Sequence, residues 1–411
     1  MQAKTFFLIM AALGFCLRAE EPGKAYAVDE LVARLLQVNP ALRIEDRSAA
    51  MDYENLRLEG RLSNPRLSAT IGSGKPHGAA EAERRIWGMG VEWALPNPAT
   101  RAHTLRGRRW EIRAAEAWRR KARWQQVHAF KARLYDLLRL ESQREMQAEM
   151  VADLERIAAI VDARVAVGEA KRLDSLWTKS TLALARTRHR EMTGLIAARR
   201  QEIHAALAGT LPTEIAVADE AGNPPAVPAL PELEAQLQNN PGLQARRSLV
   251  SMCASQVTAA RSGWLPDLGF HIERAREVDA SVWKTGVSLE IPIFSSTLSR
   301  VPLMRYQRER AELESRRQEL QDKEELVRLH AEMSALRDGL NALEDVELAV
   351  GREAVRLAEL GLRSGELSLL HYLEARKSWH ELSMKRPELV AGLRAANSAL
   401  EALIGGWNHE E

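Results

Sequence analysis

The chain has 411 residues, of which 58 are Lys or Arg and 56 are Asp or Glu, so its net charge is only +2. Such an even balance provides no global field for binding nucleic acid. Charged residues make up 28% of the chain and aromatic residues only 5%, which favours long, solvent-flanked helices over a compact β-sandwich.

Residues 1–19 have the pattern of a secretory signal peptide. Lys4 precedes an apolar stretch at 6–17, and Ala19 is a plausible cleavage position. This stretch is too short to span a bilayer, which takes roughly 20 apolar residues. Cys16 leaves lipidation open as the alternative to plain cleavage. The mature chain then keeps only Cys253, which excludes a disulfide framework and a thiolate metal cluster.

The first half begins with two predicted helices. Leu31, Leu35 and Val38 follow a helical period that ends at Asn39-Pro40, and an Arg-, Glu- and Ala-rich helix follows over about 41–62. The apolar period then changes from 3.6 to 2, which predicts a β-hairpin over 66–95. Its return strand has one apolar face, formed by Trp87, Met89, Val91 and Trp93, and Glu92 on the opposite face.

A very long helix is predicted after Pro98, because Gly107 is the only Gly and there is no further Pro before Val167. About 70 residues at ~1.5 Å each would reach ~100 Å. The apolar residues step by three and four, as in a coiled coil, at Val127, Phe130, Leu134 and Leu137 and again at Met150, Leu154, Ile157 and Val161. Gly168 ends this helix, and a second helix returns to about Leu207.

The second half repeats the first after roughly 200 residues, far beyond the period of a solenoid repeat. Asn39-Pro40-Ala41-Leu42 returns as Asn240-Pro241-Gly242-Leu243, and Gly168-Glu169 returns as Gly365-Glu366. We therefore expect repeats at 20–211 and 232–411, joined by a Pro-rich linker at 212–231.

The elements of the second repeat follow the order of the first. A hairpin is predicted over 267–291, then a long helix from Pro302 to about Arg363 with Gly339, Gly351 and Gly361 as weak points. A turn follows at Gly365, and the return helix reaches about Leu403 with a kink at Pro387. The hairpin again has two faces. The apolar face carries Trp283, Val287, Leu289 and Ile291, and the polar face carries His271, Glu273, Lys284, Ser288 and Glu290.

In this order of elements the chain resembles the TolC-type outer-membrane efflux family, and it is similar to the heavy-metal and multidrug RND-type branch. Two kinds of motif carry the resemblance: Leu-x-x-Asn-Pro-x-Leu at 36–42 and 237–243, and Gly-Glu-x-x-x-Leu-x-x-Leu at 168–176 and 365–373. It covers almost all of the mature chain.

The resemblance implies a mostly α fold with a small β part. Duplicated long antiparallel α-hairpins would form a coiled-coil α-tunnel, and three chains supplying four strands each would close a 12-stranded transmembrane β-barrel with an aqueous lumen. Glu92, His271, Glu273, Lys284, Ser288 and Glu290 would then face the lumen. The residues facing lipid would be Trp87, Met89, Val91, Trp93, Trp283, Val287, Leu289 and Ile291.

The resemblance also implies partners. The protein would be a homotrimer in the outer membrane of a Gram-negative bacterium, with its helices in the periplasm. It would be the passive exit duct of a tripartite system that carries metal cations or small organic compounds from an inner-membrane pump. The helical turns would dock a periplasmic adaptor through Val167, Gly168, Glu169, Ser364, Gly365, Glu366 and Leu367. Asp174, an acidic position frequent in the family, corresponds to His371 in the second repeat.

No catalytic, cofactor or metal-binding pattern is present in the sequence. The ten His residues are scattered without metal-ligand spacing, and there is no phosphate-binding loop or nucleophile elbow. We therefore expect no enzyme. Two alternatives to an exit duct are a periplasmic coiled-coil adaptor, which would carry one hairpin between Gly-rich β-domains, and a soluble coiled-coil scaffold, which would need neither a signal peptide nor alternating strands.

Overall fold

The computed structural model describes residues 25–74, 84–218, 224–278, 280–290, 297–364 and 366–406. The predicted signal peptide with Cys16, and the predicted site residues Ile291 and Gly365, lie outside these ranges. The chain divides into two compact units. The first comprises Met1–Pro40, Gln125–Pro228 and Arg328–Ala402, and the second comprises Ala41–Trp124, Ala229–Val327 and Leu403–Glu411.

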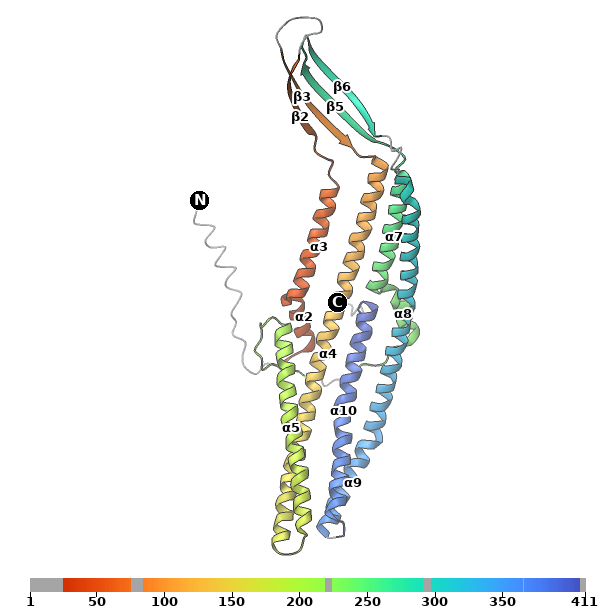
Figure 1. Ribbon diagram of the computed structural model, residues 1–411. Helices are drawn as coiled ribbons and strands as arrows, with labels where there is room; N and C mark the ends of the chain where they lie inside the picture. Colours follow the sequence, from red (N-terminus) through yellow and green to blue (C-terminus); the bar gives the residue numbers. More distant parts are fainter. Residues whose placement is uncertain are drawn as a thin grey trace, which may run out of the picture. The chain divides into compact units, whose positions relative to one another are not determined.

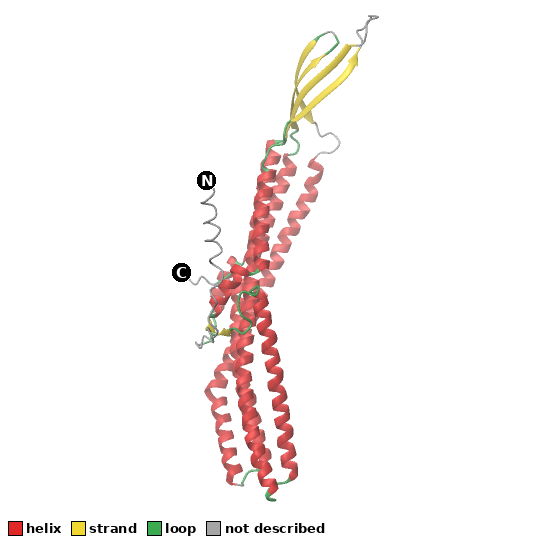
Figure 2. Ribbon diagram, turned by 90° about the vertical axis from the view of Figure 1, so that its left-hand side faces the viewer, coloured by secondary structure: helices red, strands yellow, loops and turns green. Residues whose placement is uncertain are grey.

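The second unit contains a four-stranded antiparallel sheet (Figures 1 and 2). Its strands are β2 (Arg66–Gly74), β3 (Arg84–Leu95), β5 (Asp267–Arg276) and β6 (Ser281–Glu290), in the order β2-β3-β5-β6. Both predicted hairpins are therefore present. They are joined into one sheet by β3 and β5, which pair from Trp87 opposite Arg276 to Leu95 opposite Leu268.

Helices continue from the sheet within the second unit. They are α3 (Pro40–Glu59), the first part of α4 (Pro98–Ala166), α6 (Leu230–Gln236), α7 (Pro241–Ser262) and the first part of α8 (Val301–Ala342). Short 3-10 turns at Leu237–Asn239 and Thr297–Arg300 precede α7 and α8. The Asn-Pro motif has a local cause, because the side chain of Asn240 accepts a hydrogen bond from the amide of Leu243 at 3.1 Å and so caps α7.

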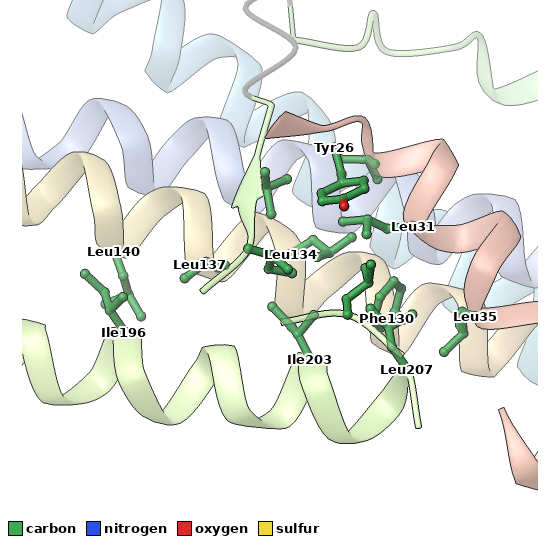
Figure 3. Packing of buried hydrophobic residues seen from close by; sticks show 14 residues of the cluster. Tyr26, Leu31, Leu35, Phe130, Leu134, Leu137, Leu140, Ile196, Ile203 and Leu207 are labelled. Atoms are coloured by element: carbon green, nitrogen blue, oxygen red, sulfur yellow. The ribbon is translucent and has the colours of Figure 1, made fainter. Parts of the chain in front are cut away.

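The core of the first unit lies between α2 (Val28–Val38), α4 and α5 (Arg172–Ala206). Figure 3 shows Phe130, Leu134 and Leu137 of α4 packed between residues of α2 and α5. The short parallel strands β1 (Ala25–Tyr26) and β4 (Ala216–Val217) close this core by burying Tyr26 and Val217. The apolar residues predicted to form a seam at three- and four-residue steps are thus buried, as amphipathic helices require.

A second core cluster in the same unit contains Met150, Leu154, Ile157 and Val161, the other predicted seam of α4. These residues pack with Leu182 and Ala185 of α5, Ala358 of α9 (Leu348–Ser364), and Tyr372 and Leu373 of α10 (Leu369–Ile404). The two helical hairpins of the first unit therefore share one apolar interior.

The second long helix differs from the expectation. It is divided into α8 and α9 by a π-helical turn at Leu343–Glu347, and neither Gly339 nor Gly351 is where it changes. A π-helical turn holds one extra residue within the helical path and needs no Gly or Pro to form. Pro387 lies inside α10, which continues through it to Ile404. In the described ranges, no helix is both long enough and apolar enough to cross a lipid bilayer.

Candidate functional site

One face of the sheet is apolar and exposed. The register places Trp87, Met89, Val91 and Trp93 of β3 on the same face as Trp283, Val287 and Leu289 of β6, with Phe270 and Ile272 of β5 between them. All these side chains are between 36% and 66% exposed. An exposed apolar face of this extent marks a surface that meets a protein partner or a membrane.

The opposite face is polar, and glycines make room for its larger side chains. Glu92 lies opposite His271, Glu273 opposite Lys284, and Ser288 opposite Gly269. A Cβ atom at Gly88 would lie 2.6 Å from a carboxylate oxygen of Glu273, and one at Gly286 would overlap the His271 ring. The side chains of Glu273 and His271 therefore lie against glycine backbone. Lys284 forms an ion pair with Glu277 at 2.8 Å, and Glu290 pairs in register with Asp267.

Asn97 fixes the junction between the sheet and the helices of the second unit. It is 3% exposed, and its side-chain amide donates to the carbonyls of Ser262 and Leu265 at 2.8 and 3.0 Å. Its side-chain oxygen accepts from the amide of Ala99 at 2.9 Å, and its own amide donates to Asp267 at 2.7 Å. Asn97 was not among the residues predicted from the sequence. Its position directly before Pro98 is the helix-capping pattern that could have identified it.

The turn between α4 and α5 contains a glycine in the left-handed backbone conformation. Gly168 has φ +79°, and nothing lies within 4 Å of a Cβ atom placed there. Its amide donates to the carbonyl of Val165 at 3.1 Å, and that of Glu169 donates to Arg164 at 2.9 Å, which closes the end of α4. Val167 is 71% exposed. Leu173, Leu176 and Trp177 at the start of α5 are also exposed, so this turn carries an apolar surface.

The second turn joins α9 to α10 and lies at the same end of the first unit (Figure 1). Ser364 is the last residue of α9, and its hydroxyl donates to the carbonyl of Gly361 at 3.1 Å. The amide of Leu367 donates to the same carbonyl at 2.9 Å, and the Leu367 side chain lies against Gly361. Glu366 is exposed.

Asp174 and His371 occupy the same place in their helices. Asp174 accepts a hydrogen bond from the amide of Lys171 at 3.3 Å, which caps the start of α5. His371 also contacts the residue three positions before it, because its Nδ1 lies 2.8 Å from the side-chain hydroxyl of Ser368. Both residues therefore stabilise the first turn of a helix.

Two exposed apolar stripes, one on α3 and one on α8, were not predicted from the sequence. On α3, Ile44, Met51 and Leu58 are spaced by seven and are 57% to 67% exposed. On α8, Tyr306, Leu313, Leu320 and Val327 have the same spacing and are also exposed. Helix α3 is held to α4 by polar contacts, including the Arg119–Asp52 ion pair at 3.0 Å and the hydrogen bond from Tyr53 to Glu116. An i, i+7 repeat within a polar helix was the available signal.

The described residues hold no group of three His, Cys, Asp or Glu side chains that could bind a metal ion. Cys253 is buried, and that burial raises the pKa of its thiol, which keeps it protonated and unreactive.

The chain is similar in sequence to a curated protein and in structure to several solved proteins. CzcC, the cobalt-zinc-cadmium resistance protein of Cupriavidus metallidurans, is 23% identical over 255 residues, which are 61% of this chain and 60% of CzcC. The match thus spans less than two thirds of that relative. The structure is similar to CusC, with a TM-score of 0.81 and 16% identity over 95% of this chain and 96% of CusC.

It is also similar to VceC of Vibrio cholerae, with a TM-score of 0.79 and 16% identity over 92% of this chain and 96% of VceC. At these identities the structures establish the fold, a mostly helical chain with a small sheet, as predicted. The model of the outer membrane efflux protein family matches residues 31–209 and 233–406. A match to this family agrees with the prediction that the chain is not an enzyme. The chain belongs to the outer membrane efflux protein family.

Proposed function

We propose that this protein is the passive exit duct of a tripartite efflux system in the outer membrane of a Gram-negative bacterium. The observation that carries the proposal is the two-faced sheet, with an exposed apolar face and a charged, glycine-lined face. A membrane-inserted sheet that encloses water has this distribution, because lipid contacts one face and solvent the other.

The two faces support one orientation. Trp87, Met89, Val91, Trp93, Trp283, Val287 and Leu289 face lipid, and Glu92, His271, Glu273, Lys284 and Ser288 face the lumen. The predictions that Glu290 faces the lumen and Ile291 faces lipid rest on the sequence pattern alone. The reverse orientation would put the whole polar row, from Glu92 and His271 to Glu273 and Lys284, in lipid, where charged side chains destabilise a membrane-spanning sheet. The exposed charges on the inner face would contact solutes only weakly, which suits a duct that must release its cargo.

Unsatisfied edges support a homotrimer. Among the described strands, the outer strands β2 and β6 each have one side that pairs with no other strand, and an exposed edge of this kind tends to pair with another chain. The stripes of α3 and α8 lie on the helices next to these edge strands, and they are the apolar surfaces that a neighbouring copy would cover. In a ring of three copies, β6 and α8 of one copy would meet β2 and α3 of the next, which closes twelve strands.

The helical turns are proposed to dock a periplasmic adaptor. Val167, Gly168 and Glu169 form an exposed turn beside the apolar residues at the start of α5. Ser364, Glu366 and Leu367 belong to the second turn. A helical hairpin of an adaptor could pack its apolar residues on these surfaces and pair its charges with the glutamates. The pump in the inner membrane would supply the energy.

The cargo is proposed to be metal cations or small organic compounds. The metal alternative is favoured by the relative CzcC, whose name refers to cobalt, zinc and cadmium resistance. No tight metal site is required in a duct, because a ligand set that retained the ion would block transport.

The test is the size and location of the full-length protein after extraction in detergent. We expect it in outer-membrane fractions as a trimeric rod by light scattering and negative-stain imaging, and we expect its deletion to raise sensitivity to metal cations or organic compounds. A water-soluble monomer or dimer would contradict the proposal and favour an adaptor or a scaffold.

A further inference from the structure

The apolar face of the sheet carries three arginines at its turn end. The register places Arg276 opposite Trp87, Arg274 opposite both Met89 and Trp283, and Arg85 opposite Ser73. Arg85 and Arg276 lie on neighbouring strands one step apart along the same face, and Arg274 and Arg276 are two residues apart on β5. All three side chains are exposed. Arg85 is the second residue of β3 and Arg276 the last of β5, so the cluster lies at the opposite end of these strands from Leu95, after which α4 begins.

Among the described side chains of the sheet, these arginines have no acidic neighbour on their own face. The sheet's carboxylates with described side chains, Glu92, Asp267 and Glu273, belong to the opposite face. Within the described ranges, none of the three guanidinium groups forms an ion pair, whereas Lys284 on the other face is paired with Glu277. Three adjacent cations without counter-charges repel one another, so an anion from outside the chain would stabilise them.

Aromatic side chains fix the level of this cluster relative to a bilayer. The guanidinium carbon of Arg274 lies 5.4 Å from the centre of the Trp283 ring, and Trp87 is the neighbour of Arg276. Tryptophan rings collect at the level of lipid head groups. Arginines beside them on the lipid side would thus reach the phosphates of the head groups rather than the hydrocarbon.

We propose that Arg85, Arg274 and Arg276 form a binding site for the phosphate groups of lipopolysaccharide, the phosphorylated lipid of the outer leaflet. This inference rests on the proposed function, in which the apolar face contacts outer-membrane lipid and the helical turns dock a periplasmic adaptor. The turns of the β-hairpins would then face the outer leaflet. A guanidinium group binds a phosphate through two parallel hydrogen bonds, so three of them on one face suit a lipid with more than one phosphate.

The probe is lipid A added to the full-length, detergent-extracted protein. We expect diphosphoryl lipid A to raise the Tm of the wild-type protein, and we expect lipid A without phosphates to leave it unchanged. In the variant R85Q/R274Q/R276Q the apparent affinity for diphosphoryl lipid A falls at least about tenfold. The control R106Q/R109Q/R190Q removes the same charge from exposed positions of α4 and α5 and keeps the wild-type affinity.

Several outcomes would overturn the site. Equal affinity of R85Q/R274Q/R276Q and the wild-type protein would do so, and so would equal Tm shifts with phosphorylated and phosphate-free lipid A. A Tm shift of the same size with inorganic phosphate would replace the lipid by a free anion. The comparison of the two lipids in the wild-type protein needs no variant, so it stands even if the triple variant fails to fold.

Membrane fractionation separates this inference from the proposed function. If the wild-type protein is in the outer membrane but its Tm shifts equally with diphosphoryl and phosphate-free lipid A, only the arginine site is wrong. If the wild-type protein is not in the outer membrane, the proposed function itself is wrong.

Discussion

Single buried polar residues hold neighbouring elements together in this protein. In the second unit, Asp322 of α8 accepts hydrogen bonds from Asn240 at 3.2 Å and from Gln318 at 2.9 Å, and it is only 4% exposed. Asn240 also caps α7, so this pair connects the start of one helix to the side of another. Burial raises the pKa of the Asp322 carboxyl, because its charged form has lost solvation.

The titration of Asp322 gives a prediction with a definite sign. Because its folded pKa is raised, the folded state binds the proton more tightly than the unfolded state, so the protein loses stability as the pH rises through the folded pKa. Asp322→Asn removes this loss of stability. The side-chain amide of Gln318 can flip, so that it still forms a hydrogen bond with the new asparagine. We expect the Tm of the variant to exceed that of the wild-type protein at pH 8 and to approach it at about pH 4.

The control for this measurement is Asp338→Asn, an exposed aspartate of the same helix. It should leave the pH dependence of the Tm as it is in the wild-type protein. A Tm difference for Asp322→Asn that grows toward acid pH would contradict the assignment.

At the scale of elements, the spacing between helices is set by side chains that lie against glycine. A Cβ atom at Gly351 of α9 would lie 2.9 Å from the Trp379 ring and 3.1 Å from Leu382, both on α10. Gly194 of α5 has nothing within 4 Å of such an atom. The two glycines therefore differ in what a methyl group would meet.

We expect Gly351→Ala to destabilise the protein by about 1–3 kcal/mol, because it forces α9 and α10 apart. Gly194→Ala should instead stabilise it by up to about 1 kcal/mol, because Ala is the better helix former. Thermal unfolding of the two variants side by side measures both effects. A loss of stability in Gly194→Ala equal to that in Gly351→Ala would show that close packing is not the cause.

The turns between the long helices give a functional prediction. Gly168 has φ +79°, which proline cannot adopt, and its amide hydrogen bond to Val165 would also be lost. We expect Gly168→Pro to leave trimers intact and abolish export, and Gly365→Trp to do the same at the second turn. Export is measured as resistance to the cargo, and trimers by light scattering.

Gly168→Asn is the matched control, because asparagine tolerates the left-handed conformation. It should keep both trimers and export. Normal export in Gly168→Pro would remove the assignment of this turn as a docking site.

At the scale of the whole molecule, the stripes on α3 and α8 predict how copies assemble. A fully buried Leu contributes about 1.5–3 kcal/mol, so Leu313 and Leu320 of each copy would add substantially to a ring of three. We expect Leu313→Glu with Leu320→Glu to yield monomers in detergent. Gln307→Glu with Gln321→Glu adds the same charge one residue beyond the stripe at exposed positions and should leave trimers. Trimers in both variants would exclude the stripe as the interface.

Much of this architecture follows from local patterns in the sequence. The change of apolar period from 3.6 to 2 predicts a hairpin over 66–95, and the observed β2 and β3 both lie within it. The seam from Val127 to Leu137 identifies the buried side of α4, and Gly168 marks its turn. These features are predictable because the period of a helix or strand alone decides which residues share a face.

The tertiary structure decided what depends on residues far apart in the chain. The pairing of β3 with β5 joins Val91 to Ile272 and has no local signal, yet it brings Arg85 near Arg276. The junction at Asn97 uses carbonyls of Ser262 and Leu265, and the π-helical turn at Leu343–Glu347 has no breaker residue. The sequence by itself determined the elements and their faces, because these depend on neighbours. Register and contact between elements were decided only by packing, because many alignments satisfy the same local pattern.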